Sequence, residues 1–165
     1  MSTFKDKTLM ITGGTGSFGN AVLNRFINED FKEIRIFSRD EKKQDDMRHR
    51  LRNPKVNFII GDIRDFESIN EAMRGVDYVF NAAALKQVPS CEFYPMQAVR
   101  TNILGSENVL EAAVRNKVKR VVVLSTDKAA YPINTMGMTK ALMEKLAISK
   151  SRDHRAKENG TVICA

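Results

Sequence analysis

Short apolar runs alternate along this chain with longer segments whose apolar residues recur every three or four positions. The short runs are typical of buried strands, and the longer segments are typical of helices with one buried face. Strict alternation of the two predicts a parallel sheet covered by helices on both faces, a doubly wound α/β fold. The predicted strands are Thr8–Thr12, Glu33–Phe37, Val56–Ile60, Tyr78–Asn81, Arg120–Leu124 and Thr161–Ala165. The predicted helices are Ser17–Glu29, Asp40–Arg52, Phe66–Arg74, Met96–Asn116 and Thr135–Lys150.

Composition excludes several classes of protein. The chain has 165 residues, of which 42% are hydrophobic and 28% charged, so it suits one globular domain and not a disordered segment. No apolar run approaches the roughly 18–20 residues of a membrane span, and the N-terminus lacks the pattern of a secretory signal. Cys91 and Cys164 lie far apart, which excludes a disulfide scaffold and a cysteine-based zinc site. We therefore expect a cytoplasmic protein with no membrane insertion and no bound metal.

The charge balance is basic, with 27 Lys and Arg residues against 20 Asp and Glu residues and a net charge of +7. Such a balance favours anionic partners, which include phosphorylated small molecules and nucleic acids. The cations are spread over several segments and mixed with acids, and no aromatic residues interleave with them as base stacking needs. We interpret them as solvated helix faces and expect no nucleic-acid partner.

A glycine-rich turn joins the first predicted strand to the first predicted helix. Its sequence over Thr12–Gly19 is TGGTGSFG, with glycines spaced as G-x-x-G-x-x-G. In this context Gly13 permits the tight turn, Gly16 lets backbone approach a pyrophosphate at the helix N-terminus, and Gly19 lets the helix pack closely on the strand. That arrangement predicts a Rossmann-type dinucleotide site. The predicted cofactor contacts in this turn are Gly13, Thr15, Gly16, Ser17, Phe18 and Gly19.

The ends of the following strands extend this site. Ser38 and Arg39 stand after the second strand, where an NAD-preferring site usually has an acid. An arginine there pairs with a 2′-phosphate, so we expect NADP in preference to NAD. The alternative is that Arg39 is a surface residue and Asp40 merely caps the next helix. Asp62, which follows the third strand, could accept a hydrogen bond from an adenine amino group. The further predicted cofactor contacts are Ile63, Ala82, Ala83 and Ala84.

Segments at the strand ends and on two helices together resemble the extended short-chain dehydrogenase/reductase family. They are TGGTGSFG, GDIRD, NAAALK, TNILGSENVLEAA and LSTDKAAYP, and they span essentially the whole chain. Within that family they resemble the UDP-N-acetylglucosamine 4,6-dehydratases of bacterial capsule and surface-polysaccharide synthesis. The resemblance implies that residues 1–165 are the N-terminal, NADP-binding Rossmann domain of a homo-oligomeric protein about twice as long. It also implies a UDP-sugar substrate and a C-terminal substrate-binding part that this chain lacks.

The family's usual catalytic pair, Tyr-x-x-x-Lys, is only half present. Its lysine corresponds to Lys140, which the resemblance implies bonds the nicotinamide ribose, while Met136 stands in the place of the tyrosine. Tyr131 is the nearest tyrosine, but it lies in a Pro-containing loop and cannot slide into place. A branch of these dehydratases is similar in having methionine here, so we interpret Met136 as the mark of a subfamily. The alternative is a pseudoenzyme that binds cofactor without catalysis.

The other implied site residues come from three segments. Asp127 and Lys128 resemble the family's acid and base, with Asp127 protonating the leaving C6 hydroxyl and Lys128 removing the C5 proton. Thr126 would bond the substrate near C4, and Lys86 would bind the sugar or its diphosphate. Asn102 matches a helix residue that stabilises the site, and we group it with the substrate contacts. Either Lys86 or Lys128 could take the C4-hydroxyl proton, and the sequence leaves this choice open.

These implications predict an NADP-dependent UDP-N-acetylglucosamine 4,6-dehydratase, a lyase that inverts C5 and makes a UDP-4-keto-6-deoxy-hexosamine. A UDP-glucose or UDP-N-acetylglucosamine 4-epimerase shares the fold and the first oxidation step and is the main alternative. A second alternative is a dinucleotide-binding domain with no catalytic role. We expect this chain by itself to be inactive, because it supplies only one wall of the sugar site.

Overall fold

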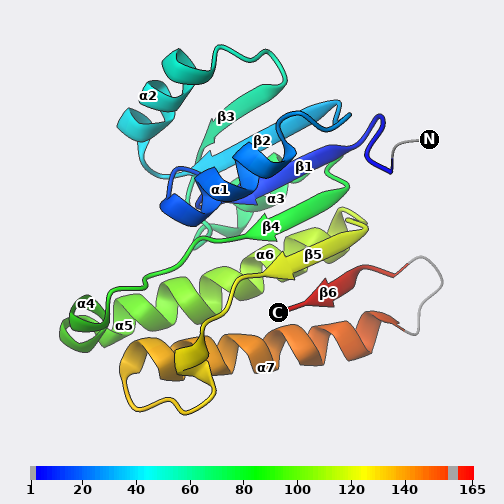
Figure 1. The fold of residues 1–165 in the computed structure, drawn as a ribbon. Coiled ribbons are helices and arrows are strands. Elements are labelled where there is room, and N and C mark those ends of the chain that lie inside the picture. The colour runs from blue at the N-terminus through cyan, green and yellow to red at the C-terminus, as the bar shows by residue number, and fades with distance from the viewer. Residues whose placement is uncertain (1–2, 156–159) are drawn as a thin grey trace.

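The computed structural model describes residues 3–155 and 160–165, and these form a parallel sheet with helices on both faces (Figure 1). The sheet order is β3-β2-β1-β4-β5-β6, and every neighbouring pair is parallel. The doubly wound α/β fold predicted from the alternation of elements is therefore confirmed. The strands are β1 Thr8–Thr12, β2 Glu33–Ser38, β3 Val56–Ile60, β4 Tyr78–Asn81, β5 Arg120–Val123 and β6 Val162–Cys164.

The central strand β1 carries the two halves of the core on its two faces. All five of its residues are buried, as expected for a strand covered on both sides. Leu9 and Ile11 pack toward one face of the sheet, while Met10 packs toward the other, because side chains alternate along a strand. Thr12 ends the strand in register with Phe37 of β2 and Asn81 of β4, so three strand ends meet there.

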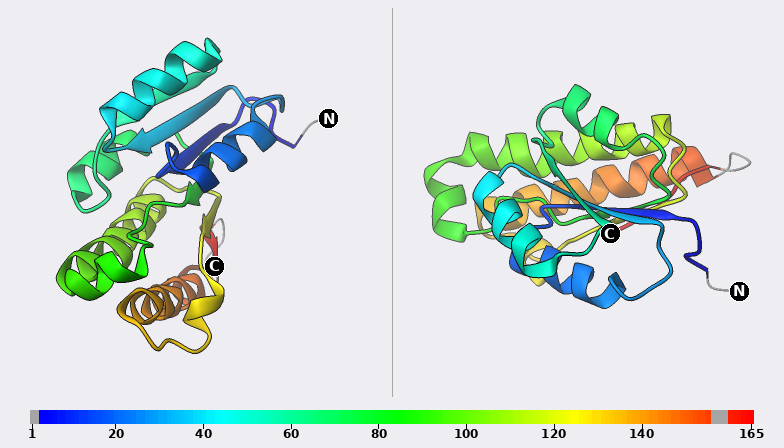
Figure 2. Two further views of the ribbon diagram at one scale, coloured as in Figure 1. Left: turned by 60° about the vertical axis from the view of Figure 1, so that its left-hand side comes forward. Right: turned by 90° about the horizontal axis from the view of Figure 1, so that it is seen from above.

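Two layers of helices cover the sheet. Figure 2 shows the helices α1 and α2 on one side of the strands and α3, α6 and α7 on the other. The first layer is α1 Ser17–Phe26 and α2 Glu41–Leu51, and the second is α3 Phe66–Ala72, α6 Ser106–Arg115 and α7 Thr135–Arg155. Asp40 caps α2 by accepting a hydrogen bond from the Lys43 backbone N–H, and Arg52 ends that helix in a left-handed conformation.

The segment predicted as one helix over Met96–Asn116 is broken into three pieces. It consists of α5 Pro95–Ala98, the π-helical segment η1 Val99–Gly105, and α6. A β-carbon on Gly105 would lie 2.8 Å from the Ile63 side chain, so the helix and the loop after β3 are in close contact there. Apolar periodicity does not register such contacts, which is why the sequence predicted a uniform helix.

Other boundaries differ in smaller ways. The helix α4 Val88–Phe93 and the short 3₁₀ turn η2 Asp127–Ala129 were not predicted. Both are too short to show an apolar period. The helix α1 ends at Phe26 and not at Glu29, while α7 continues past Lys150 to Arg155.

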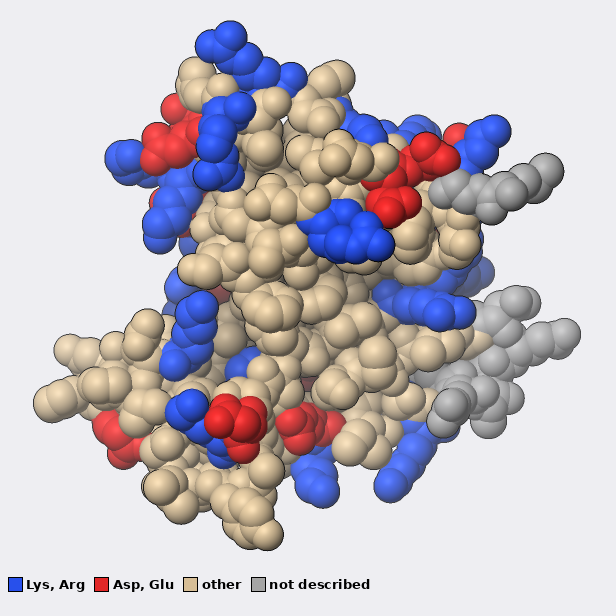
Figure 3. Space-filling model, in the orientation of Figure 1, with Lys and Arg blue, Asp and Glu red and all other residues tan. Residues whose placement is uncertain are grey.

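The layer formed by α1 and α2 does not reach over β4, β5 and β6 in the described part of the chain. Val122 of β5 and Val162 of β6 are 38% and 45% exposed on that side. Figure 3 shows few charged residues over these strands, while cations and acids are mixed around the margins of the same face. A cavity of about 280 Å³ opens there, and its walls include Leu9, Phe26, Phe31, Tyr78, Phe80 and Val122.

Two kinds of feature are absent from residues 3–155 and 160–165. No helix in these ranges has the length and apolar character needed to cross a membrane. Nor do these ranges contain a cluster of three or more His, Cys, Asp or Glu residues that could hold a metal ion.

Candidate active site

The carboxyl ends of β1 to β4 open into a cavity of about 590 Å³. Parallel strands in such a sheet direct their ends to one edge, where ligands of doubly wound proteins bind. The structure brings together there most of the predicted cofactor contacts: Gly13, Thr15, Gly16, Ser38, Arg39, Asp62, Ile63, Ala82, Ala83 and Ala84. It adds wall residues that the sequence did not single out, which are Phe37, Asp40, Lys43, Gly61 and Thr101.

The glycine turn is packed so tightly that two of its glycines admit no side chain. Gly13 has a φ of +63°, and a β-carbon there would lie 2.7 Å from the backbone nitrogen of Ala83. A β-carbon on Gly19 would lie 2.5 Å from the α-carbon of Gly14. The turn is held to β2 by a hydrogen bond of 2.8 Å from the Gly13 N–H to the Phe37 carbonyl. Its conformation therefore depends on glycine at both positions.

The N-terminus of α1 lacks the side-chain cap that its neighbours have. Gly16 is the N-cap of α1, and no side chain accepts from the first turn. By contrast, Asp40 caps α2, and Asp65 caps α3 by accepting from the N–H groups of Glu67 and Ser68. Since the first N–H groups of a helix have no partner within it, α1 presents free donors beside the cavity that Gly16 lines. Free donors at a helix N-terminus suit a phosphate group.

The side chains of Ser17 and Phe18 lie outside this cavity. The Phe18 ring stacks on Phe80 of β4, with centroids 5.7 Å apart and planes inclined by 18°. Ser17 is exposed and does not line the cavity wall. Their contact with a cofactor stays a prediction, and it would be made through their backbone N–H groups at the uncapped end of α1.

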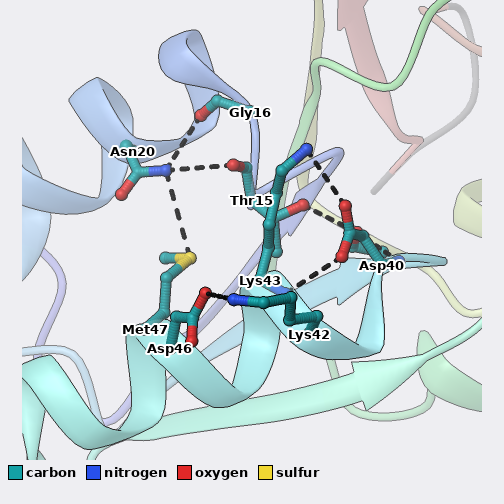
Figure 4. Close-up of polar contacts among 9 residues, drawn as sticks. Thr15, Gly16, Asn20, Asp40, Lys42, Lys43, Asp46 and Met47 are labelled. Atoms are coloured by element: carbon teal, nitrogen blue, oxygen red, sulfur yellow. Dashed lines mark hydrogen bonds and ion pairs between the residues drawn. The ribbon is translucent and has the colours of Figure 1, made fainter.

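A small polar network closes the cavity at the end of β2. The hydroxyl groups of Thr15 and Ser38 lie 2.8 Å apart, and the Asp40 N–H donates to Ser38 over 3.2 Å. Lys43, from the first turn of α2, lies 3.0 Å from the Asp40 carboxylate (Figure 4). Arg39 is half exposed, and its guanidinium lies 3.6 Å from Asp62. Arg39 and Lys43 thus place two cations at the point where the sequence predicted one.

Asp62 is held by the arginine that follows it. Arg64 donates to one carboxylate oxygen of Asp62 through Nε and Nη2, over 2.8 and 2.6 Å. Burial alone would raise the pKa of Asp62, but the hydrogen bonds and charge of Arg64 outweigh it, so the pKa lies below its ordinary value. The other oxygen, Oδ1, accepts from the Arg64 backbone N–H. Asp62 is an ionised acceptor at the cavity wall, and its contact with an adenine stays a prediction.

A second cavity, of about 460 Å³, adjoins the first at the ends of β4 and β5. The two share Ala82, Ala84 and Lys86 as wall residues. The remaining walls come from α4, β5, η2 and α7, and include Val88, Ser125, Thr126, Lys128, Met136 and Lys140. The fold therefore brings Thr126, Lys128, Met136 and Lys140 to one cavity, as the sequence predicted for a catalytic site.

Lys140 is the buried lysine of this second cavity. Its residue is 5% exposed, and its Nζ donates to the Leu124 carbonyl over 2.6 Å. Desolvation is the main reason that its pKa falls from 10.5 to about 8; the charge of Glu144 partly opposes this fall, and the charge of Lys86 adds a smaller share to it. One turn earlier, Met136 is equally buried and packs with Cys91 and Ala98. Position 136 therefore has no hydroxyl group, unlike the tyrosine that the family usually has there.

Asp127 differs from what its predicted role requires. Its side chain is 85% exposed and does not line the second cavity, although Lys128 does. A hydrogen bond from Thr126, together with the Lys128 ammonium 3.5 Å away, lowers the pKa of Asp127 below its ordinary value of 3.8. A general acid near neutral pH needs a raised pKa, so in this environment Asp127 is an ionised carboxylate.

Asn102 is not among the residues that line the second cavity, and its grouping with the substrate contacts stays a prediction. It is fully buried in η1, and its side-chain amide bonds both backbone groups of Leu85, over 2.8 and 2.9 Å. It also donates to Thr139 over 3.0 Å, and Thr139 donates to the Met136 carbonyl. Asn102 therefore holds the loop after β4 against α7.

The chain matches one family over nearly its whole length. The sequence profile described as "Polysaccharide biosynthesis protein" matches residues 9–165. A protein named UDP-glucose 4-epimerase in Rickettsia canadensis is 70% identical over 165 residues, which are 98% of this chain and 48% of that protein. The chain therefore spans about half the length of such relatives.

Solved structures show the same fold. The X-ray structure of Pen from Bacillus thuringiensis is 41% identical, with a TM-score of 0.92 over 96% of this chain and 48% of Pen. A dTDP-glucose 4,6-dehydratase from Streptomyces venezuelae, solved with NAD bound, is 23% identical, with a TM-score of 0.79 over 88% of this chain and 52% of the dehydratase. The second likeness concerns the fold alone. By the match over residues 9–165, this chain belongs to the polysaccharide biosynthesis protein family.

Proposed function

We propose that the protein to which this chain belongs is an NADP-dependent UDP-N-acetylglucosamine 4,6-dehydratase that inverts C5. The observation that carries this proposal is the pair of adjoining cavities with Lys86 in both walls. The first suits a dinucleotide and the second holds a cluster of lysines beside Thr126, so a cofactor and a sugar would meet at their junction. Residues 1–165 are then the cofactor domain, and the remainder of the protein completes the sugar site.

The first cavity has the donors that an NADP molecule needs. The uncapped N-terminus of α1 offers backbone N–H groups to the pyrophosphate. Arg39 and Lys43 stand together at the end of β2, where a ribose 2′-phosphate would lie. Asp62 offers a carboxylate to the adenine. The solved Streptomyces venezuelae dehydratase carries NAD, so the choice of NADP rests on Arg39 and Lys43 alone.

The residues around the second cavity divide the chemistry of dehydration between them. A nicotinamide cofactor held in the first cavity would supply the acceptor for a hydride from C4 of the sugar and the donor for its return at C6. Thr126 orients the C4 oxygen, and Lys128 removes the C5 proton, which is acidic once C4 is a carbonyl. Asp127 protonates the departing C6 hydroxyl. For that it must become buried against the remainder of the protein, because burial raises the pKa of a carboxyl group.

A second candidate is a UDP-sugar 4-epimerase. The relative at 70% identity from Rickettsia canadensis carries the name UDP-glucose 4-epimerase, which favours this reaction. An epimerase needs the same cofactor and the same oxidation at C4, followed by rotation of the keto-sugar and return of the hydride to C4. It does not need Asp127 to act as an acid, which agrees with the lowered pKa of that residue.

Product analysis with the full-length protein separates the candidates. UDP-N-acetylglucosamine is incubated with NADP⁺ in deuterated water, and the product is followed by NMR. A 4-keto-6-deoxy product with deuterium at C5 supports the dehydratase, and a C4 epimer without C5 deuterium supports the epimerase. UDP-glucose is tested in the same way, and cofactor binding with turnover of neither sugar would contradict both candidates and favour a non-catalytic domain.

Two variants test the division of roles. For the dehydratase we expect Lys128→Ala to lose C5 exchange, and Asp127→Asn to keep exchange while losing elimination by about 10²–10⁴-fold. Lys145→Ala serves as the matched control, because Lys145 is an exposed lysine on α7 away from both cavities. Unchanged elimination in Asp127→Asn would exclude the acid role.

A further inference from the structure

The second cavity lacks the group that would start the reaction. Oxidation of a sugar hydroxyl requires a base for the O–H proton. Met136 has no ionisable atom, and it is buried among Cys91, Ala98, Leu85 and Val88. Tyr131 is 88% exposed in the loop before α7 and does not line the cavity. The base must therefore be sought among the lysines of the cavity wall.

The lysines of this wall stand in different environments. Lys86 is exposed at the junction of the two cavities. Lys128 is half exposed and lies 3.5 Å from the Asp127 carboxylate. Lys140 alone among these is buried, because α7 packs against η1 and places its side chain under the end of β5. Removal from water disfavours an ammonium group and favours the neutral amine, which has the lone pair that a base needs.

The partners of Lys140 leave this lone pair available. The Nζ atom has one oxygen acceptor, the Leu124 carbonyl at 2.6 Å, and lies 3.8 Å from the Met143 sulfur. A neutral amine donates to that carbonyl through one N–H and keeps its lone pair for another atom. Glu144 lies one turn further along α7, but its carboxylate is engaged by the Ser125 hydroxyl. The other charged groups that line the cavity are Lys86 and Lys128, and the positive charge of Lys86 favours a neutral Lys140.

We propose that Lys140 is itself the base that takes the C4-hydroxyl proton of the sugar, in the role that a tyrosine at position 136 would have had. This inference rests on the proposed function, and it holds for the dehydratase and the epimerase alike. The O–H bond breaks, its electron pair becomes the second bond of the C4 carbonyl, and the hydride leaves C4 for the oxidised nicotinamide. The proton joins the Nζ lone pair, and the resulting ammonium donates a hydrogen bond to the Leu124 carbonyl and is favoured by the negative charge of Glu144.

The proposed role of Lys140 predicts how the rate of C4 oxidation depends on pH. With a pKa of about 8, Lys140 is half neutral near pH 8 and mostly protonated at lower pH. The rate of C4 oxidation should therefore rise with pH and level off above about 8. A lysine that serves only to bind ribose and add positive charge would instead work best when protonated, so its contribution would fall over the same range.

The first test measures Lys140 without any turnover. The full-length protein is treated briefly with an amine-acylating reagent over a range of pH, and labelling of each lysine is followed by peptide mass spectrometry. We expect the Lys140 amine to reach half of its maximal reactivity near pH 8, and exposed Lys145 on the same helix is followed in the same samples as the reference. Equal midpoints for the two lysines would overturn the inference.

The second test measures the oxidation step itself. Full-length protein loaded with NADP⁺ is mixed with UDP-N-acetylglucosamine, and reduced nicotinamide is followed in a single turnover by absorbance. We expect Lys140→Arg, which keeps the charge but cannot act as a base near neutral pH, to lose about 10²–10⁴-fold in rate. Lys145→Arg makes the same chemical change at an exposed site and should leave the rate unaltered.

The outcomes separate the inference from the proposed function. If wild-type protein reduces NADP⁺ at a rate that does not follow the Lys140 midpoint found by labelling, the inference is wrong whether or not Lys140→Arg folds. If Lys140→Arg oxidises the sugar like wild type, the inference is also wrong. If wild type binds NADP⁺ yet forms no reduced nicotinamide with UDP-N-acetylglucosamine, while Lys140 still labels near pH 8, the proposed function has failed and the base role falls with it.

Discussion

At the scale of single residues, Lys140 is a side chain that the fold buries although its charged form favours water. Its ammonium is buried with one carbonyl oxygen for a partner, and desolvation lowers its pKa from 10.5 to about 8. A fall of this size corresponds to a folding penalty on the order of 3 kcal/mol at neutral pH. The fold tolerates this penalty at a cavity wall, which is where strained or desolvated groups are usually found.

We expect Lys140→Met to raise the free energy of unfolding at pH 7 by about 2 kcal/mol, after about 1 kcal/mol is subtracted for the hydrogen bond to Leu124. The folded-state pKa lies below the unfolded value, so the unfolded chain binds more protons between pH 8 and 10.5. The penalty is therefore complete below pH 8 and lost as the pH rises through 10.5. Urea unfolding of the wild type and of Lys140→Met at pH 7 and pH 10.5 checks this. If the difference between their free energies of unfolding does not become smaller at pH 10.5, the prediction is contradicted.

The proposed preference for NADP also rests on single residues. Arg39 and Lys43 both line the first cavity, whereas Lys42 pairs with Asp46 on the outer side of α2. We expect Arg39→Ala to weaken NADP binding by about 1.5–3 kcal/mol and to leave NAD binding nearly unchanged, because only NADP carries the 2′-phosphate. Lys43→Ala should act in the same direction, and Lys42→Ala should do nothing. Calorimetry measures the affinity of each variant for NADP and for NAD. Equal losses of affinity for the two cofactors would exclude a contact of Arg39 and Lys43 with the 2′-phosphate.

At the scale of elements, the π-helical segment η1 links two parts of the site. Asn102 lies in its middle and bonds Leu85 after β4 and Thr139 on α7, so the loop and the helix are held at one spacing. If these residues formed a regular α-helix, the residues after Gly105 would face a different direction about the helix axis from the one they face now. The irregularity is thus tied to the hydrogen bonds that fix the walls of the second cavity.

We expect Asn102→Ala to destabilise the fold by about 2–3 kcal/mol, because it removes three hydrogen bonds at once, two to the backbone of Leu85 and one to Thr139. Asn108→Ala is the matched control on the next helix. It removes one hydrogen bond, to the partly buried Ile63 carbonyl, and should lose about 1 kcal/mol. Urea unfolding of the two variants gives the comparison, and similar losses would mean that Asn102 has no special part in holding the loop.

For the whole molecule, the sheet is covered unevenly. The helices α1 and α2 cover β1 to β3, and the same face of β4 to β6 carries exposed Val122 and Val162 beside a cavity with aromatic walls. Apolar area of this kind marks a contact surface or an aggregation liability. The chain spans about half the length of its relatives, and the sugar site that we propose needs walls beyond those described.

We expect the 165-residue chain to bind a hydrophobic fluorescent dye on this face and to show no turnover of UDP-N-acetylglucosamine. Introducing Val122→Lys together with Val162→Lys should abolish most of the dye fluorescence. Ile60→Lys adds a charge to exposed β3 at the opposite edge of the sheet and should leave the fluorescence in place. Dye binding that survives the double substitution, or measurable turnover by this chain, would contradict the prediction.

The sequence alone was enough to predict the doubly wound sheet, the residues of β1, β3 and β4, and the glycine turn before α1. Those features depend on local information, since the apolar period, the turn residues and the chain order of strands and helices are all properties of short segments. It also placed Lys140 one turn after Met136 on a single helix face. Phe18 and Asn102 lie on the predicted helices, and their contacts with a cofactor and a substrate stay predictions, since neither side chain lines a cavity of the candidate site.

Only the tertiary structure decided which of the named residues are buried and what each one touches. Asn102 meets Leu85 and Lys140 meets Leu124 across gaps of many residues, and Lys43 reaches the cavity from a helix that looked merely solvated. Burial and hydrogen bonding depend on which segments meet in space, and a pattern read along one segment carries no information about the segment that will lie against it. For this reason the sequence was enough to name Lys128 and Lys140 as candidates for the site. That Lys128 is exposed and Lys140 is buried could be learned only from the fold.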